Sequence, residues 1–156
     1  MHILITAGGT REYIDPVRFI SNASSGRMGY ELAKASLKAG HKVSLITTIE
    51  KKTPLLNQIN IIKVKSAAEM FEAVKDNFVN CDCLIMAAAV ADYTPITESK
   101  IKIKKQQSEL VIKLKPTTDI LKWAGKNKEI KNEKGKSKKR IVVGFALEDN
   151  NLLQNA

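Results

Sequence analysis

The sequence contains few of the residues on which metal-centred or nucleophilic catalysis depends. Its 156 residues include only two cysteines and two histidines, and 5% of them are aromatic. His2 and His41 stand at the starts of apolar segments and are interpreted as structural, and no His/Cys/Asp cluster with metal-ligand spacing is present. Cys81 and Cys83 fit neither a C-x-x-C redox motif nor a zinc site, so both are predicted to be buried thiols. Any chemistry is therefore expected to depend on positioning and on phosphate electrostatics.

Long hydrophobic runs are also missing. No apolar run reaches the roughly 18 residues that a membrane-spanning helix needs. The N-terminus passes directly into an apolar segment, without the charged region and apolar core of a signal peptide. We therefore expect a cytoplasmic protein without membrane contact. The length and an apolar content of 44% fit a single domain over residues 1–156.

Positive charge is abundant but unevenly placed. The net charge is +10, and residues 100–140 hold 15 Lys/Arg against 4 Asp/Glu. Such asymmetry raises the possibility of a basic nucleic-acid-binding domain, whose affinity would fall steeply with salt. The segment contains one aromatic residue, Trp123, and no nucleic-acid-binding motif, and much of 126–140 is typical of a solvated loop or helix end. Nucleic acid is accordingly the less favoured partner.

Apolar periodicity predicts alternating strands and helices. Strands are expected at His2–Thr6, Lys42–Thr47, Asn60–Val64, Cys83–Ala88 and Arg140–Phe145, and helices at Arg27–Ala39, Ser66–Phe78 and Asp119–Ala124. Residues Lys100–Lys104 and Glu109–Leu114 alternate in polarity around a polar turn and predict a lysine-rich β-hairpin. This order predicts an α/β fold, a Rossmann-like doubly wound and mainly parallel sheet with a lysine-rich hairpin flap.

The long loop over residues 7–29 is the most informative segment. About twenty residues separate the first strand from the first helix, far more than the usual few, and such loops are typically functional or disordered. It is rich in Arg, Asn, Ser and Gly, and Gly26 and Gly29 allow backbone N–H groups to approach a ligand. The helix N-terminus behind the loop favours negative charge. A phosphorylated substrate is predicted, although the same glycines and serines could serve only turns and an N-cap.

Three other features have both functional and purely structural interpretations. The glycines at 8–9 and at 26–29 do not form a G-x-G-x-x-G fingerprint, which disfavours an NAD(P) oxidoreductase. The segment 87–92, AAAVAD, follows an apolar strand; it could contact a flat ring or ribose, with Asp92 on a hydroxyl or Mg²⁺, or simply pack closely. Lys102 and Lys104 could protect a sheet edge from aggregation or cover phosphates as a mobile cationic flap.

Four motifs in order resemble the phosphopantothenoylcysteine synthetase family, the phosphopantothenate–cysteine ligases of coenzyme A biosynthesis. They are AGGTREYIDPVRFISNASSGRMG (7–29), AAAVADY (87–93), KIKK (102–105) and VGFALEDNN (143–151). The resemblance implies that CTP activates the carboxylate of 4′-phosphopantothenate to an acyl-cytidylate with loss of pyrophosphate. Cysteine then displaces CMP to form the amide. It also implies Mg²⁺, a homodimer whose flap reaches the neighbouring subunit, and in some cases a separate phosphopantothenoylcysteine decarboxylase.

The resemblance also implies roles for individual residues. Asn22, Arg18 and Lys102 would be catalytic, with Asn22 holding the acyl intermediate. Substrate would be bound by Gly9, Ser24, Ser25 and Gly26. The nucleotide would be bound by Ala87, Ala88, Asp92, Lys102, Lys104, Lys105, Asp119 and Phe145. Asp92 is also the candidate metal ligand.

The sequence departs from the family pattern in two places. The family fold continues past the 143–151 motif through a helix with further nucleotide-contacting lysines, which this chain is expected to lack. The usual K-N-P-D-I segment is replaced here by KPTTDI at 115–120. A non-catalytic homologue that binds only phosphopantothenate or a nucleotide is therefore an alternative. No FMN is expected, and the preference between CTP and ATP is left open.

Overall fold

The structure is a computed structural model that describes residues 1–50, 57–105, 107–131 and 137–146. The helices are α1 (Arg27–Lys38), α2 (Ala67–Phe78) and α3 (Ile120–Lys126). The strands are β1 (His2–Ala7), β2 (Arg11–Tyr13), β3 (Phe19–Ser21), β4 (Lys42–Thr47), β5 (Asn60–Lys63), β6 (Cys83–Met86), β7 (Tyr93–Pro95), β8 (Leu114–Pro116), β9 (Glu129–Lys131), β10 (Ser137–Lys139) and β11 (Ile141–Gly144). None of the helices in these ranges has the length and apolar character needed to cross a membrane.

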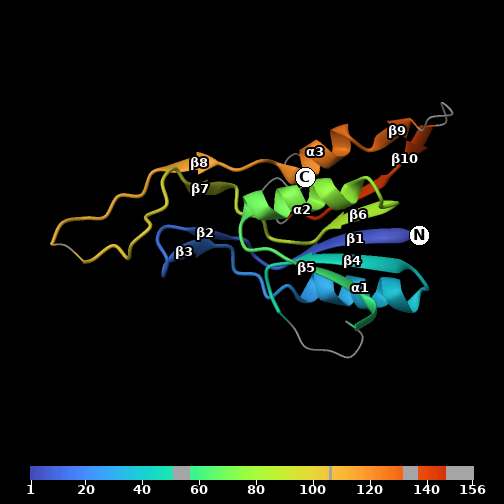
Figure 1. The fold of residues 1–156 in the computed structure, drawn as a ribbon, viewed down its shortest axis with the longest axis horizontal. Coiled ribbons are helices and arrows are strands. Elements are labelled where there is room, and N and C mark those ends of the chain that lie inside the picture. The colour runs from blue at the N-terminus through green and yellow to red at the C-terminus, as the bar shows by residue number, and fades with distance from the viewer. Residues whose placement is uncertain (51–56, 106, 132–136, 147–156) are drawn as a thin grey trace.

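The central sheet has five strands in the order β11-β6-β1-β4-β5, and every neighbouring pair is parallel. Helix α1 packs on one face of the sheet, and α2 and α3 cover the other face (Figure 1). The chain moves outward from β1 through β4 to β5, then returns to the other side of β1 through β6 to β11. This confirms the predicted Rossmann-like α/β fold.

Alternation along β1 divides the core between the two faces. Ile3 and Ile5 point into the cluster beneath α1, whereas Leu4 joins the cluster beneath α2 and α3. Cys81 and Cys83 are also buried, as predicted, and burial raises the pKa of the Cys81 thiol to about 11. Both thiols therefore act as packed core groups.

The predicted start of α2 is confirmed in detail. Ser66 Oγ accepts a hydrogen bond from Glu69 N at 3.2 Å, as an N-cap should. The Glu69 carboxylate reaches one residue further back than in a standard capping box and accepts from Lys65 N at 2.8 Å. The buried carboxylate of Glu12 accepts from Ala67 N at 2.9 Å, so the N–H groups of Ala67 and Glu69 in the first turn of α2 are both bonded to side chains.

The predicted strands of the lysine-rich hairpin are wrong. Antiparallel pairing joins β7 to β8, with Tyr93 opposite Pro116, and the described residues between them, 96–105 and 107–113, project from the fold and are called the arm (Figure 1). Lys100–Lys104 is not a strand, and of Glu109–Leu114 only Leu114 is in one. The reason lies in the tertiary structure, because the backbone N–H and C=O of Ile103 are bonded to side chains of Asp15 and Arg18, far away in the sequence.

Two short hairpins lie where loops were predicted. Within 7–29, β2 pairs with β3 and brings the rings of Tyr13 and Phe19 into edge contact at 5.5 Å. Arg11 lies over the Phe19 ring at 5.1 Å, so cross-strand aromatic and cation–π contacts stabilise this pair. Within 126–140, β9 pairs with β10. Residues 132–136 of that basic segment, and the end of the 143–151 motif, lie outside the described residues.

Candidate functional site

The candidate site lies at the carboxyl ends of β1 and β6, where the strand order reverses. Ligands of open α/β sheets bind at such a switch point. The two loops that leave these strands are bonded to each other: Ala89 N donates to Gly8 O at 2.9 Å, and Thr10 N donates to Ala89 O at 3.2 Å. The buried Thr10 hydroxyl accepts from Ala91 N at 2.9 Å. The predicted substrate and nucleotide loops therefore form one structure.

Asn22 lies against both of these loops. A Cβ at Gly9 would lie 2.5 Å from Asn22 O, so the close approach of the Asn22 backbone requires glycine there. The Asn22 side chain is exposed, and its Nδ2 donates to Val90 O at 3.2 Å. This places a side-chain amide, with both a donor and an acceptor, beside the loops that leave the carboxyl ends of β1 and β6.

The N-terminus of α1 opens beside this amide. Gly26, the N-cap residue, has φ of 65°, and no side chain in the described part of the protein caps the helix. Its first turn contains no acidic residue. Ser24 Oγ accepts from Gly26 N at 3.3 Å, and Ser25 is exposed. An uncapped helix start with two nearby hydroxyls is suited to an anion such as a phosphate ester.

The predicted nucleotide residues are only partly brought together. Ala87 and Ala88 are half-buried, and Ala88 N donates to Thr6 Oγ1 at 3.1 Å. Phe145 is 52% exposed and follows Gly144, which pairs with Met86, so it reaches the same sheet edge. Asp119 is exposed, and its Oδ1 accepts from Lys122 N at 2.8 Å as the N-cap of α3.

The three predicted lysines lie on the arm, and Arg18 lies where the arm meets the 7–29 segment. Lys102, Lys104 and Lys105 are exposed. Arg18 Nε donates to Asp15 Oδ2 at 3.0 Å, and the Arg18 guanidinium holds the pKa of the Asp15 carboxyl well below its usual range. The Arg18 side chain is thus hydrogen-bonded both to Asp15 and to the backbone of the arm.

Asp92 is the candidate ligand for a metal ion. It is exposed, and within the described ranges no group of three or more His, Cys, Asp or Glu side chains could hold a metal. Mg²⁺ is commonly held by one or two carboxylates together with substrate phosphates and water. A single carboxylate at the switch point fits that mode of binding, and does not fit a site built from protein ligands alone.

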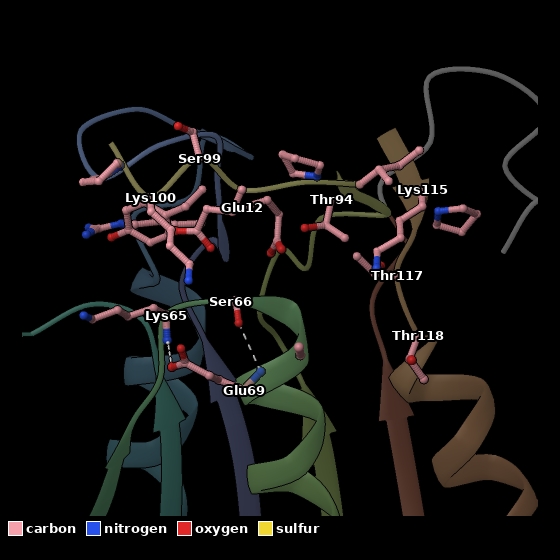
Figure 2. A pocket seen from close by; sticks show the side chains of 18 residues that line it. Glu12, Lys65, Ser66, Glu69, Thr94, Ser99, Lys100, Lys115, Thr117 and Thr118 are labelled. Atoms are coloured by element: carbon pink, nitrogen blue, oxygen red, sulfur yellow. Dashed lines mark hydrogen bonds between the residues drawn. The ribbon is translucent and has the colours of Figure 1, made fainter. Parts of the chain in front are cut away.

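A large cleft adjoins this site on the α2 side. It has a volume of about 1080 Å³ and lies between β2, the start of α2 and the β7–β8 pair (Figure 2). Its cations are Arg11, Lys65, Lys100 and Lys115. None of the residues predicted for the site lines it. Thr117, which does line it, connects the two regions because its hydroxyl donates to Ala91 O at 2.6 Å and its N–H to Asp92 O at 2.8 Å.

Sequence reasoning missed the residues that hold the site loops in place. Thr10 and Thr117 give no local signal, since their partners are 81 and 26 residues away. Asp15 did carry a signal. An Asp-Pro pair favours an Asx-type turn, and Asp15 Oδ1 accepts from both Val17 N and Arg18 N at 2.9 Å.

Comparison with known proteins identifies similar chains. The family model described as "DNA/pantothenate metabolism flavoprotein C-terminal domain" matches residues 1–156. A protein named cysteine/cysteine sulfinic acid decarboxylase, from an unknown prokaryotic organism, is 49% identical over 154 residues, which are 99% of this chain and 41% of that protein. The coenzyme A biosynthesis bifunctional protein CoaBC of Bacillus subtilis (strain 168) is 45% identical over 147 residues, covering 94% of this chain and 34% of the relative.

A solved structure extends this likeness to the fold. The crystal structure of the C-terminal domain of a CoaBC protein superposes with a TM-score of 0.72 at 39% identity. The match covers 96% of this chain and 64% of the solved one. The chain thus spans less than half of the two relatives and just under two thirds of the solved domain.

Proposed function

Because the chain belongs to the DNA/pantothenate metabolism flavoprotein C-terminal domain family, we propose that it is a ligase of coenzyme A biosynthesis that joins 4′-phosphopantothenate to cysteine. A carboxylate oxygen of phosphopantothenate attacks the α-phosphorus of CTP, and pyrophosphate leaves. The cysteine amine then attacks the acyl carbon and loses a proton, and CMP leaves. Both steps transfer groups without oxidation or reduction, so the proposal requires no flavin.

The proposal is carried by the uncapped start of α1 beside Asn22. The phosphate of phosphopantothenate takes the place of the missing cap and receives N–H groups from the helix start, with Ser24, Ser25 and Gly26 around it. Asn22 is then within the same crevice as the carboxylate end of the substrate. Its amide exchanges its bond to Val90 O for one to the acyl intermediate.

The nucleotide is assigned to the Ala87–Asp92 segment and the cationic groups around it. The small Ala87 and Ala88 leave room for a base or ribose. Asp92 would hold Mg²⁺ jointly with the nucleotide phosphates, and the metal would neutralise the charge of the leaving pyrophosphate. Lys102, Lys104 and Lys105 of the arm would approach the same phosphates.

A homodimer is part of the proposal. The arm exposes large apolar side chains, with Ile101 77% and Val111 78% exposed. Leu110 and Ile96 on the same arm are also exposed. Several exposed apolar side chains on one segment favour a protein interface, and a second copy of the chain is the partner we propose. A separate decarboxylase would consume the product, phosphopantothenoylcysteine.

Pyrophosphate release is the measurement that tests this function. The purified chain would be given Mg²⁺, CTP and 4′-phosphopantothenate, with and without cysteine, and the assay repeated with ATP. Release that requires phosphopantothenate but not cysteine supports acyl-nucleotide formation and identifies the preferred nucleotide. Binding of phosphopantothenate without any release would contradict the ligase and support the binding-only alternative.

A further inference from the structure

The Asp15 carboxylate is buried where the turn at 15–18 meets the arm. Its side chain is fully buried. Oδ1 accepts from Val17 N and Arg18 N, both at 2.9 Å. Oδ2 accepts from Arg18 Nε at 3.0 Å and from Ile103 N at 3.1 Å. The backbone N–H groups of the turn at 15–18 bond to Oδ1, whereas Oδ2 holds the Arg18 side chain and, through Ile103 N, the arm.

Oδ2 and Arg18 together hold both backbone groups of Ile103. Arg18 Nη2 donates to Ile103 O at 2.6 Å, while Ile103 N donates to Asp15. In extended chain the N–H and C=O of one residue point to the same side, where a neighbouring strand would bond them. The Asp15–Arg18 pair supplies one acceptor and one donor in that strand's place. We call the unit of Asp15, Arg18 and Ile103 the clasp.

The clasp lies between the arm lysines and the segment that leads to Asn22. Ile103 lies directly between Lys102 and Lys104, two of the residues assigned to the nucleotide phosphates. At the other end, Arg18 precedes β3, which leads directly into Asn22. A second bond, from Ser99 N to Ile14 O at 2.9 Å, fixes the base of the arm to the same turn. The backbone between Lys102 and Lys104 and the strand that leads into Asn22 are therefore both attached to the turn at 15–18.

We propose that Asp15 is a positioning residue, which with Arg18 clasps the backbone of Ile103 and so holds Lys102 and Lys104 over the nucleotide phosphates. The identity of the phosphates rests on the proposed function, whereas the clasp rests on the hydrogen bonds alone. Arg18 accordingly acts through the arm as well as through any contact of its own with substrate.

Amide hydrogen exchange tests the clasp without reference to activity. In Asp15→Asn the pair with Arg18 is weakened, and we expect the Ile103 amide to exchange about tenfold faster or more, as for loss of a hydrogen bond to a charged group. Arg18→Lys, which retains Asp15 and the charge, should produce a smaller increase. Asp76→Asn, on the exposed side of α2, is the matched control and should leave Ile103 unchanged. Equal exchange of Ile103 in the wild-type and Asp15→Asn chains would overturn the clasp.

Steady-state kinetics tests the positioning role. We expect Asp15→Asn to raise KM for the nucleotide about tenfold and to change KM for phosphopantothenate less than about twofold. In a chain that already has Lys102→Gln, adding Asp15→Asn should raise KM for the nucleotide much less. Both substitutions then act on the same interaction, that of Lys102 with the phosphates. Fully additive effects, or equal effects on both substrates, would overturn the positioning role. A wild-type chain that releases no pyrophosphate would refute the ligase, while the Ile103 exchange would still decide the clasp.

Discussion

Among individual residues, Asn22 has the surroundings that a catalytic amide requires. Its backbone lies close to Gly9, its side chain is exposed, and among the described residues its amide bonds only to the Val90 carbonyl of the opposite loop. A ligand can displace that single bond without disturbing the fold. The residue is therefore held by its main chain and free to act through its side chain.

Replacing Asn22 by Asp should separate the two half-reactions. The carboxylate cannot donate to the acyl intermediate and repels its phosphate, so amide formation should slow by about 10² or more while carboxylate activation persists. Pyrophosphate release without cysteine and product formation with cysteine are measured separately. Asn57→Asp, an exposed substitution outside the site, serves as the control. Equal loss of both half-reactions would contradict the role assigned to Asn22.

Lys102→Gln should weaken use of the nucleotide and spare phosphopantothenate. Removal of one cation from the phosphates should raise KM for CTP by about tenfold, with binding of phosphopantothenate largely retained. Initial rates over a matrix of both substrates measure the two effects. Lys42→Gln, at the amino end of the sheet, gives the baseline for loss of one exposed lysine. If phosphopantothenate binding fails first, the assignment of Lys102 is wrong.

Asp15 should make stability depend on acid pH. Its pKa is lower in the folded chain than the usual value of 3.8, chiefly because of the Arg18 hydrogen bonds. Its stabilising contribution is therefore complete above that value and is lost as pH falls through the lower folded pKa. Urea unfolding should give a difference between wild type and Asp15→Asn that is large at pH 7 and smaller near pH 3. A difference that grows on acidification would contradict this sign.

Among the elements, α1 and α2 begin in opposite ways. The start of α2 is closed by Ser66, Glu69 and Glu12, whereas no side chain caps α1. The two helices pack on opposite faces of the sheet, and both begin near the carboxyl ends of its strands (Figure 1). A closed helix start stabilises the fold, and an open one remains available to a ligand. This contrast supports the proposal that the substrate phosphate binds at the start of α1.

Ser66→Ala should lower the free energy of unfolding by about 1 kcal/mol, because the Glu69 N–H loses its acceptor. Chemical denaturation at neutral pH measures the change, and the kinetic constants should stay as in the wild type. Ser36→Ala, inside α1, should instead be neutral or slightly stabilising because alanine has the higher helix propensity. A loss of activity without a loss of stability in Ser66→Ala would indicate that the cleft beside α2 takes part in the reaction.

At the scale of the whole molecule, the arm is the part least explained by one copy of the chain. It projects from the sheet with exposed apolar side chains, while the two cores lie on either side of the central strands (Figure 1). Water contact with so many apolar groups is unfavourable, and association through the arm would remove it. The projecting lysines would then lie near a second copy.

Val111→Asp should shift the chain toward monomer. A charge placed in an apolar interface opposes association by desolvation, and a dissociation constant at least about tenfold weaker is expected. Sedimentation equilibrium measures it. Val79→Asp, at the end of α2, is the matched control, since Val79 is 67% and Val111 78% exposed. A chain that is monomeric before substitution would contradict the homodimer.

The sequence by itself determined the elements whose signals are local. Apolar periodicity located β1, β4, β6 and α1, and the Ser66 cap located the start of α2, because these features depend on neighbours within one turn or strand. Motif order also identified the family. The same local information placed Asn22, Ser24 and Gly26 in one loop before a helix, which is where the structure has them.

Only the tertiary structure decided which distant groups meet. The alternating polarity of residues 100–104 predicts that Ile103 pairs in a local hairpin. Its backbone is instead bonded to Asp15 and Arg18, 88 and 85 residues away. Thr10 and Ala91 join the two site loops in the same way. Hydrogen bonds between such separated residues depend on the sheet order that brings β1 beside β6, and no local pattern of side chains encodes that order. The sequence therefore supplied the parts of the candidate site, and the fold decided how they are held together.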